Sequence, residues 1–243
     1  MMISARRFGS VTRLALCAAL LLTGATVAGA QGLPDIPEHR GERTLLPERL
    51  PLLPLPNIGI LPNHEASLRI VEPRYRDLVA DALAGDRIIG VVQLQPGFEA
   101  DYEGRPPVFG IGGAAVIVNA EPQPNGGLEI VLRGLQRFRI VTEDKPSLSY
   151  RIAQVEPIRE PPAAEIAAAL RALRPELEDA LAYSLGVDPK GLRLPPMSDF
   201  ELVDSIVGNM DWQPVDRQLL MEKPDAVARA RLLIEYLNEG RKN

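Results

Sequence analysis

Side chains that commonly act as nucleophiles, general bases or metal ligands are scarce in this sequence. It contains one cysteine, Cys17, and two histidines, His39 and His64. His39 belongs to a charged, proline-broken segment, where a solvated tail residue is the expected state. His64 follows Pro62 and Asn63, and a zinc site there would need nitrogen or sulfur ligands that the neighbouring sequence does not offer. We therefore expect no metal, no cofactor and no catalytic residue.

A glycine-rich stretch from Phe109 to Gly113 is the nearest approach to a phosphate-binding motif. A phosphate loop would continue into a helix that opens with Gly-Lys-Ser/Thr, whereas alanine, valine and isoleucine follow here. Glycines inside a strand allow bending or close packing of a second backbone. The stretch therefore predicts a barrel strand over residues 108–120 and no nucleotide site.

The first 30 residues have the pattern of a secretory signal peptide. Three arginines precede the apolar run Leu14–Leu22, and Ala28-Gly29-Ala30 before Gln31 fits a signal-peptidase site, with cleavage between Ala30 and Gln31. The apolar run is too short for a stable membrane span, although an uncleaved leader would act as an anchor. Twin-arginine, lipoprotein and mitochondrial signals fit less well. We expect an exported, periplasmic protein, with membrane anchoring as the alternative.

Cleavage of this leader changes the charge and the chemistry of the chain. It removes Cys17 and three of the 27 basic residues but none of the 32 acidic ones, which leaves a net charge near −8. A protein that binds nucleic acid through phosphate neutralisation needs the opposite sign. We therefore expect no nucleic-acid partner and no membrane span in the mature chain.

The residues after the leader divide into a linker, a β-rich region and a helical region. Residues 31–49 are charged and broken by prolines, as in a linker. Over 50–160, alternating apolar residues, the turn Asn125-Gly126-Gly127 and a helix from Glu72-Pro73 to Gly85 predict a small barrel with one crossing helix. Over 161–243, apolar residues recur at helical spacing and Ser198 to Glu201 form a capping box. The expected class is α+β.

Six motifs in order carry a resemblance to a known family: PLLPLPN, ILP, LRIVEPRYRDLV, GDRIIGVV, FGIGGAAVI and GLQRFRI, with RQLLMEKPDAVARARLLIEYL near the end of the chain. This order resembles the Lon N-terminal domain, the substrate-binding module of ATP-dependent Lon proteases, which also occurs as a stand-alone protein. The resemblance implies a PUA-like β pseudo-barrel followed by a helical bundle. It also implies a non-catalytic protein, because neither a Walker A motif nor the Ser-Lys protease domain is present. A Lon-like name does not by itself make a protease.

By the same resemblance, the expected ligand is an extended or unfolded polypeptide, held by an exposed sheet edge and apolar surface between barrel and bundle. Candidate contacts are Tyr75 and Phe98 as apolar anchors and Arg137 as a polar rim. Structural readings compete with these roles, since Tyr75 can pack under the helix and Arg137 can simply face solvent. A scaffold for one protein partner and a hydrolase are the alternative functions. The remaining motif residues are assigned structural roles: Glu72, Pro73, Arg74, Gly85 and Gly134.

Overall fold

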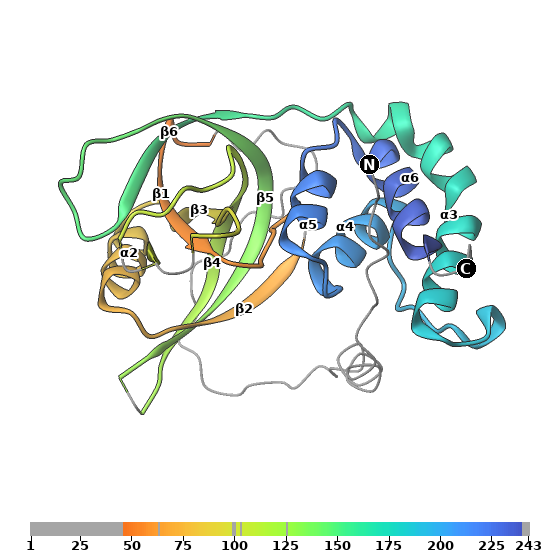
Figure 1. Ribbon diagram of the computed structural model, residues 1–243, viewed down its shortest axis with the longest axis horizontal. Helices are drawn as coiled ribbons and strands as arrows, with labels where there is room; N and C mark the ends of the chain where they lie inside the picture. Colours follow the sequence, from red (N-terminus) through yellow and green to blue (C-terminus); the bar gives the residue numbers. More distant parts are fainter. Residues whose placement is uncertain (1–45, 63, 99–100, 103, 125, 240–243) are drawn as a thin grey trace.

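The computed structural model describes residues 46–239, except for 63, 99, 100, 103 and 125. The predicted leader and its cleavage point between Ala30 and Gln31 lie outside these residues, as does nearly all of the linker. Figure 1 shows a barrel of strands with one helix, α2, against it, and a group of helices on the opposite side. This arrangement confirms the predicted α+β class and pseudo-barrel.

Five strands close into a ring, and a sixth lies outside it. The ring order is β5, β4, β3, β1, β6 and back to β5, while β2 pairs with β5 alone. Only β1 and β3 run parallel, so the sheet is mixed. The strands are β1 (Arg49–Leu55), β2 (Glu65–Ile70), β3 (Ile88–Gln93), β4 (Ile111–Pro122), β5 (Leu128–Glu143) and β6 (Arg151–Pro157).

The long strand β5 closes the ring because it pairs with different partners along its length. Its first half pairs with β2 and its second half pairs with β6. Strand β4 pairs with β5 along both halves. Irregularities in register interrupt the β4–β5 and β5–β6 ladders, and such bulges increase strand twist and bending. The predicted hairpin turn joins β4 to β5, with Gly126 at a positive φ of 78°.

Two glycines let the segment after β1 lie directly against the barrel wall. A Cβ atom on Gly113 would overlap the carbonyl oxygen of Ile60, and one on Gly134 would overlap that of Leu61. Ile60 is buried in the barrel core, whereas Leu61 belongs to the core of the helices. The predicted close-packing role of the glycine-rich stretch therefore holds at Gly113, and Gly134 does the same on β5.

Helix α2 (Pro73–Ala84) begins with its proline, as predicted, but two details of its ends differ. Glu72 is the N-cap residue, yet its carboxylate makes no capping bond and instead accepts from Arg74 Nε at 2.9 Å. Gly85 ends the helix with φ −116°, outside the left-handed region, and Arg87 takes the positive φ of 61° two residues later. The chain reverses at Arg87 because its N–H donates to the Ala82 carbonyl.

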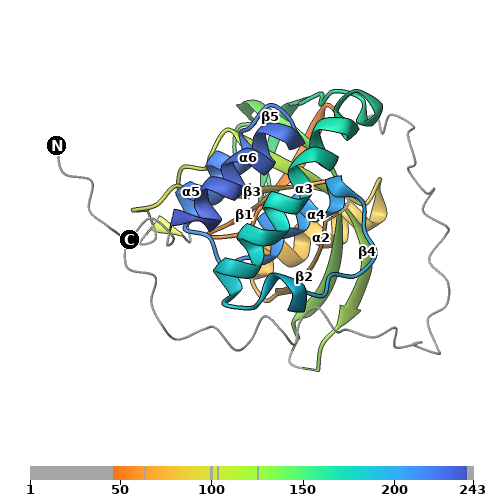
Figure 2. The same ribbon diagram turned by 90° about the vertical axis from the view of Figure 1, so that its right-hand side faces the viewer.

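The second part of the chain is helical. Figure 2 looks onto this part, with α3 and α6 side by side in front of the barrel. Its elements are α3 (Ala163–Leu185), the 3-10 turn η2 (Pro189–Gly191), α4 (Asp199–Asn209), α5 (Pro214–Met221) and α6 (Ala226–Leu237). Pro175 does not divide α3, which continues through it. The predicted capping box opens α4, with Ser198 and Glu201 bonded reciprocally.

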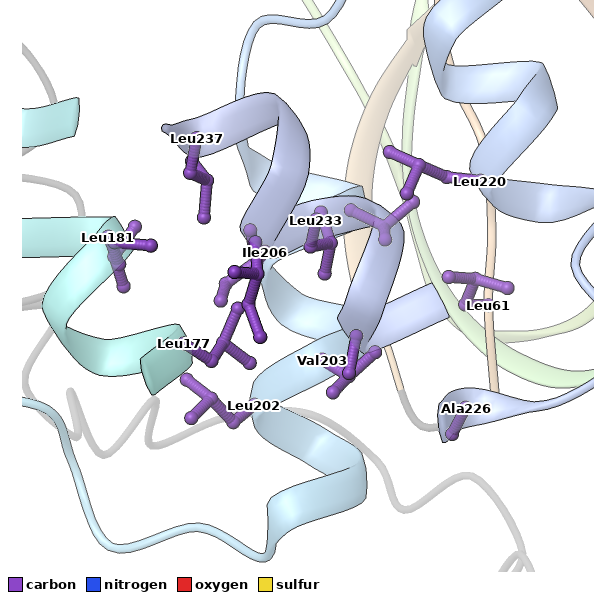
Figure 3. Close-up of a cluster of buried hydrophobic side chains, with 14 of the residues drawn as sticks. Leu61, Leu177, Leu181, Leu202, Val203, Ile206, Leu220, Ala226, Leu233 and Leu237 are labelled. Carbon is purple, nitrogen blue, oxygen red and sulfur yellow. The ribbon is translucent and has the colours of Figure 1, made fainter. Parts of the chain in front are cut away.

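The barrel contributes a side chain to the core of the helices. Figure 3 shows Leu61, from the segment between β1 and β2, near Leu220 of α5 at one end of the cluster. Side chains of α3, α4 and α6 complete this core, among them Leu177, Ile206 and Leu233. Barrel and bundle therefore share buried apolar surface, which stabilises their packing at about 25 cal/mol per Å² removed from water.

Among the described residues, no helix combines the length and the hydropathy that a membrane crossing requires. The same residues hold no group of three or more histidine, cysteine or carboxylate side chains arranged for a metal ion.

Candidate functional site

A pocket of about 240 Å³ lies at the start of α2. Figure 1 shows this helix on the side of the barrel away from the bundle. Four segments meet at the pocket: the end of β1, the first turn of α2, the loop after β3 and the turn between β5 and β6. Its lining residues are Pro54, Arg74, Tyr75, Leu94, Tyr102, Gly104, Arg105, Pro106, Pro146, Leu148, Ser149, Tyr150 and Arg151. Aromatic and proline rings therefore surround a few arginines.

Arg74 fixes one wall of this pocket. Its guanidinium lies over the rings of Tyr75 and Tyr102, 4.7 and 5.2 Å from their centroids. It also donates to the carbonyl oxygens of Tyr102 at 2.7 Å and Gly104 at 3.1 Å. Cation–π contact and charge-assisted hydrogen bonds together hold the loop after β3 against the first turn of α2.

Arg151 fixes another part of the pocket wall. It binds Glu143 through two parallel hydrogen bonds of 2.7 and 2.9 Å and donates to the Pro106 carbonyl at 2.7 Å. Arg105, between these anchored loop positions, lies 3.6 Å from the same carboxylate. All charged residues on the described lining are arginines.

The phenols of the pocket are protonated at neutral pH. Burial raises the pKa of Tyr75 and of Tyr102, and burial together with a hydrogen bond to Asp81 raises the pKa of Tyr150 to about 12. The Tyr150 hydroxyl donates to Asp81 at 2.6 Å. The described lining contains neither histidine nor cysteine. The Ser149 hydroxyl donates to the Asp77 carboxylate at 2.8 Å. These groups can bind and orient a ligand.

The structure separates the three predicted contact residues. Tyr75 lines the pocket, although its own side chain is mostly buried under α2. Phe98 is 40% exposed on the loop that also supplies Tyr102 and Arg105, but it does not line the cavity. Arg137 lies at the barrel–bundle interface and is 1% exposed, so it forms no open polar rim.

Arg137 belongs to a buried ion cluster that joins barrel to bundle. It donates to Glu160 at 2.9 Å and to the carbonyl oxygens of Met221, Lys223 and Pro224, which end α5 and lead into α6. Glu160 also accepts two bonds of 3.0 Å from Arg229, which binds Asp204 as well. Two arginines and two carboxylates therefore balance in charge inside the interface.

The prediction that Arg137 faces away from the barrel interior is confirmed, but the prediction that it faces solvent is wrong. The alternation along β5 directs Phe138 into the barrel and Arg137 away from it, and the bundle then covers that outer face. The interface is accordingly packed rather than open, so the predicted apolar binding surface between barrel and bundle is not present there in the described residues.

The pocket residues that sequence reasoning missed are Tyr102, Arg105, Tyr150 and Arg151. They come from segments far apart in the chain, and barrel closure alone brings them together. The dipeptide Arg105-Pro106 was a local signal, because proline restricts the preceding backbone and so fixes where the arginine lies.

Comparisons with known proteins agree with this fold. Residues 49–239 match the family of ATP-dependent protease La (LON) substrate-binding domains. Lon protease 2 of Myxococcus xanthus is 29% identical over 216 residues, which cover 81% of this chain and 24% of that protein. Lon protease of Geobacter metallireducens is 28% identical over 210 residues, which cover 84% of this chain and 25% of that protein. The chain thus spans about a quarter of the length of these relatives.

Solved structures show the same architecture. A Lon N-terminal domain protein from Xanthomonas campestris superposes with a TM-score of 0.53 at 21% identity, covering 77% of this chain and 98% of that one. The N-terminal domain of a Mycobacterium avium complex Lon protease gives a TM-score of 0.56 at 20% identity, with 79% and 98% coverage. Since the family match extends over most of the sequence, the chain belongs to the Lon substrate-binding domain family.

Proposed function

We propose that this protein binds extended or unfolded polypeptide at the pocket beside α2, without catalysing a reaction on it. The observation that carries the proposal is the lining itself, in which tyrosine and proline rings form apolar walls and arginines supply the polar groups. Aromatic-lined pockets with a few fixed polar groups suit the side chains of an extended peptide. The chain also belongs to a family that is named for substrate binding, which supports a binding role.

The free edge of β2 offers a second contact for such a chain. Among the described strands, β2 pairs only with β5, and Glu65, Ser67 and Arg69 are exposed along it. An extended peptide can add to an unpaired edge through main-chain hydrogen bonds, which are independent of sequence. Pocket and edge would then supply selectivity and general affinity respectively.

We propose further that the protein acts as a passive binder outside the cytoplasm. The leader over residues 1–30 supports export, and an exported protein has no ATP supply with which to couple unfolding. The described residues contain no nucleotide-binding loop. Mass spectrometry of the purified protein should find an N-terminus at Gln31; an intact leader on membrane-bound protein would contradict this location.

A titration with one test protein in two states examines the binding proposal. A reduced, unfolded protein should bind and its folded form should not, at low and at moderate salt. Leu148, 48% exposed on the pocket, and Val141, 50% exposed on β5 but not on the lining, make a matched pair. Leu148→Ser should weaken binding and Val141→Ser should not. Equal, negligible affinity for both states of the test protein would refute the proposal.

A further inference from the structure

Hydrogen bonds from two other arginines fix the backbone on either side of Arg105, but the Arg105 side chain itself makes no short polar contact in the described residues. The backbone on both sides of it is held, because Arg74 binds the Gly104 carbonyl and Arg151 binds the Pro106 carbonyl. Its guanidinium, however, meets Glu143 at 3.6 Å, beyond hydrogen-bond distance, while Glu143 already accepts two short bonds from Arg151. The structure fixes the position of Arg105 and leaves its five donors without a close acceptor in the described residues.

The three arginines of the pocket differ in how close their carboxylate partners lie. Arg74 is paired with Glu72, and Arg151 is paired with Glu143, both at hydrogen-bond distance. Arg105 is therefore the arginine of the lining that has no carboxylate at hydrogen-bond distance in the described residues, since Asp77 and Asp81 accept from Ser149 and Tyr150 instead. A ligand that brings one anionic group would complete the set, and a guanidinium binds a carboxylate best because its paired N–H groups match the two oxygens.

The rest of the lining is largely apolar, so it suits a ligand that also carries apolar atoms. Pro54, Leu94, Pro106, Pro146 and Leu148 contribute hydrocarbon, and the ring of Tyr75 adds an aromatic wall. A cavity of ~150 Å³ binds one benzene molecule, so the volume of about 240 Å³ here is of the size that suits one amino-acid residue. A carboxylate and an apolar side chain must therefore belong to a single residue, and in a polypeptide that combination occurs at the C-terminal residue.

We propose that this pocket binds the C-terminal residue of a polypeptide, with the terminal carboxylate on Arg105 and an apolar side chain against the proline and tyrosine rings. This inference rests on the proposed function and narrows its substrate to free chain ends. Internal segments would have only the walls and the β2 edge to bind, and so would bind more weakly.

Three labelled peptides of identical internal sequence test the inference on the full chain by fluorescence anisotropy. One ends in leucine with a free carboxylate, the second ends in leucine amide, and the third is the amide with aspartate before the leucine. The free acid should bind about tenfold more tightly than the amide, because a hydrogen bond to a charged group contributes about 1.5–3 kcal/mol. The aspartate peptide should resemble the amide.

Protein variants assign that difference to Arg105. Arg105→Gln should abolish the preference for the free acid and Arg105→Lys should restore part of it. Arg139→Gln, an exposed arginine on β5 outside the pocket, should leave the preference unchanged. Thermal unfolding of Arg105→Gln should lie within about 4 °C of the parent, since a partly exposed ion pair contributes little to stability.

The outcomes distinguish this inference from the broader one. Equal binding of acid and amide would overturn C-terminal recognition and leave polypeptide binding intact. Tight binding of the aspartate peptide would overturn it in favour of internal carboxylates. If neither the peptides nor unfolded protein bind, both proposals fall.

Discussion

Arginine side chains gather in two regions of this molecule, the barrel–bundle interface and the pocket beside α2, and their partners differ. At the interface, Arg137 and Arg229 are each 1% exposed and are surrounded by carboxylates and carbonyl oxygens of the chain itself. At the pocket, Arg74 and Arg151 are similarly occupied, but Arg105 keeps a partly exposed guanidinium whose nearest carboxylate among the described residues is 3.6 Å away. The interface is complete without a ligand, whereas the pocket holds one arginine with no close carboxylate in the described part of the chain.

The difference separates a structural use of charge from a binding use. A buried ion pair contributes little net stability, but removal of one partner leaves an uncompensated buried charge. An arginine beside a cavity contributes even less to stability, and its donors remain available to a ligand. Substitutions in the two regions should therefore have opposite signatures, one in the free energy of unfolding and the other in affinity.

The largest expected effect follows from removal of Arg229. Arg229→Met leaves Asp204 and Glu160 with Arg137 as their remaining close cation, and should lower the free energy of unfolding by about 3–5 kcal/mol. Urea denaturation of the full chain measures the change. Arg105→Gln is the matched control and should cost no more than about 1 kcal/mol. Similar losses for both variants would remove the distinction between the two regions.

A methyl group on the barrel wall should have the next largest effect. Gly113→Ala forces its Cβ into the carbonyl oxygen of Ile60, and overpacking of this kind costs about 1–3 kcal/mol. Gly110→Ala, where a Cβ meets no atom within 4 Å, should be nearly neutral. Thermal unfolding of both variants compares them. A tolerated Gly113→Ala would show that the backbone of Ile60 does not pack tightly against β4.

His64, which is buried with its ring against Gly208 of α4, should make the barrel–bundle interface sensitive to acid. Burial, with a contribution from Arg217, lowers its pKa below the usual 6.5, so its stabilising contribution is present above pH 6.5 and is lost as the pH falls through the folded-state value. The loss amounts to about 1.4 kcal/mol per pH unit at most within that window. His64→Gln should flatten this part of the stability curve. An unchanged stability curve would show that the pKa of His64 is the same in the folded and unfolded states.

Asp204 should contribute in the opposite direction, so the two titrations must be measured separately. Burial raises its pKa from 3.8 to about 6, and its contribution is therefore present below pH 3.8 and lost as the pH rises through about 6. The difference between parent and His64→Gln isolates the histidine, because Asp204 is common to both.

The smallest expected effect on stability is at Phe98. Its ring is 40% exposed, so Phe98→Ala should change the free energy of unfolding by no more than about 0.5 kcal/mol. If the loop after β3 guides polypeptide into the pocket, the same variant should weaken binding of unfolded protein. Unchanged affinity would confine binding to the residues that line the cavity.

Local chemistry made much of the fold predictable. Pro73 marks the start of α2, Ser198 and Glu201 mark that of α4, and Gly126 marks the β4–β5 turn, because each satisfies a backbone requirement that neighbouring residues define. The end of α2 was less predictable, since both glycine and the residues after it can reverse the chain. Here Arg87 takes the strained conformation, and Gly85 does not.

The candidate site was far less predictable, for a topological reason. Alternation along β5 indicates which face Arg137 occupies, but it carries no information about the helices that later cover that face. Likewise Arg74, Arg105 and Arg151 are distant in sequence, and they converge because β1, β3 and β6 are neighbours in a closed ring. Tyr75 was identified because it lies within a local helical motif.

The position of Leu61 in the core of the helices has a consequence for the order in which the chain is made. Residues through β6 contain every strand of the described barrel, yet Leu61 belongs to the core of the helices, and Arg137 donates to the carbonyl oxygens of Met221 and Pro224, which a ribosome adds later. During synthesis the barrel therefore displays an apolar side chain until the helices emerge, and Arg137 has Glu160 as a partner before it gains these carbonyl oxygens. Partly made chains should be more prone to aggregation and proteolysis than finished ones.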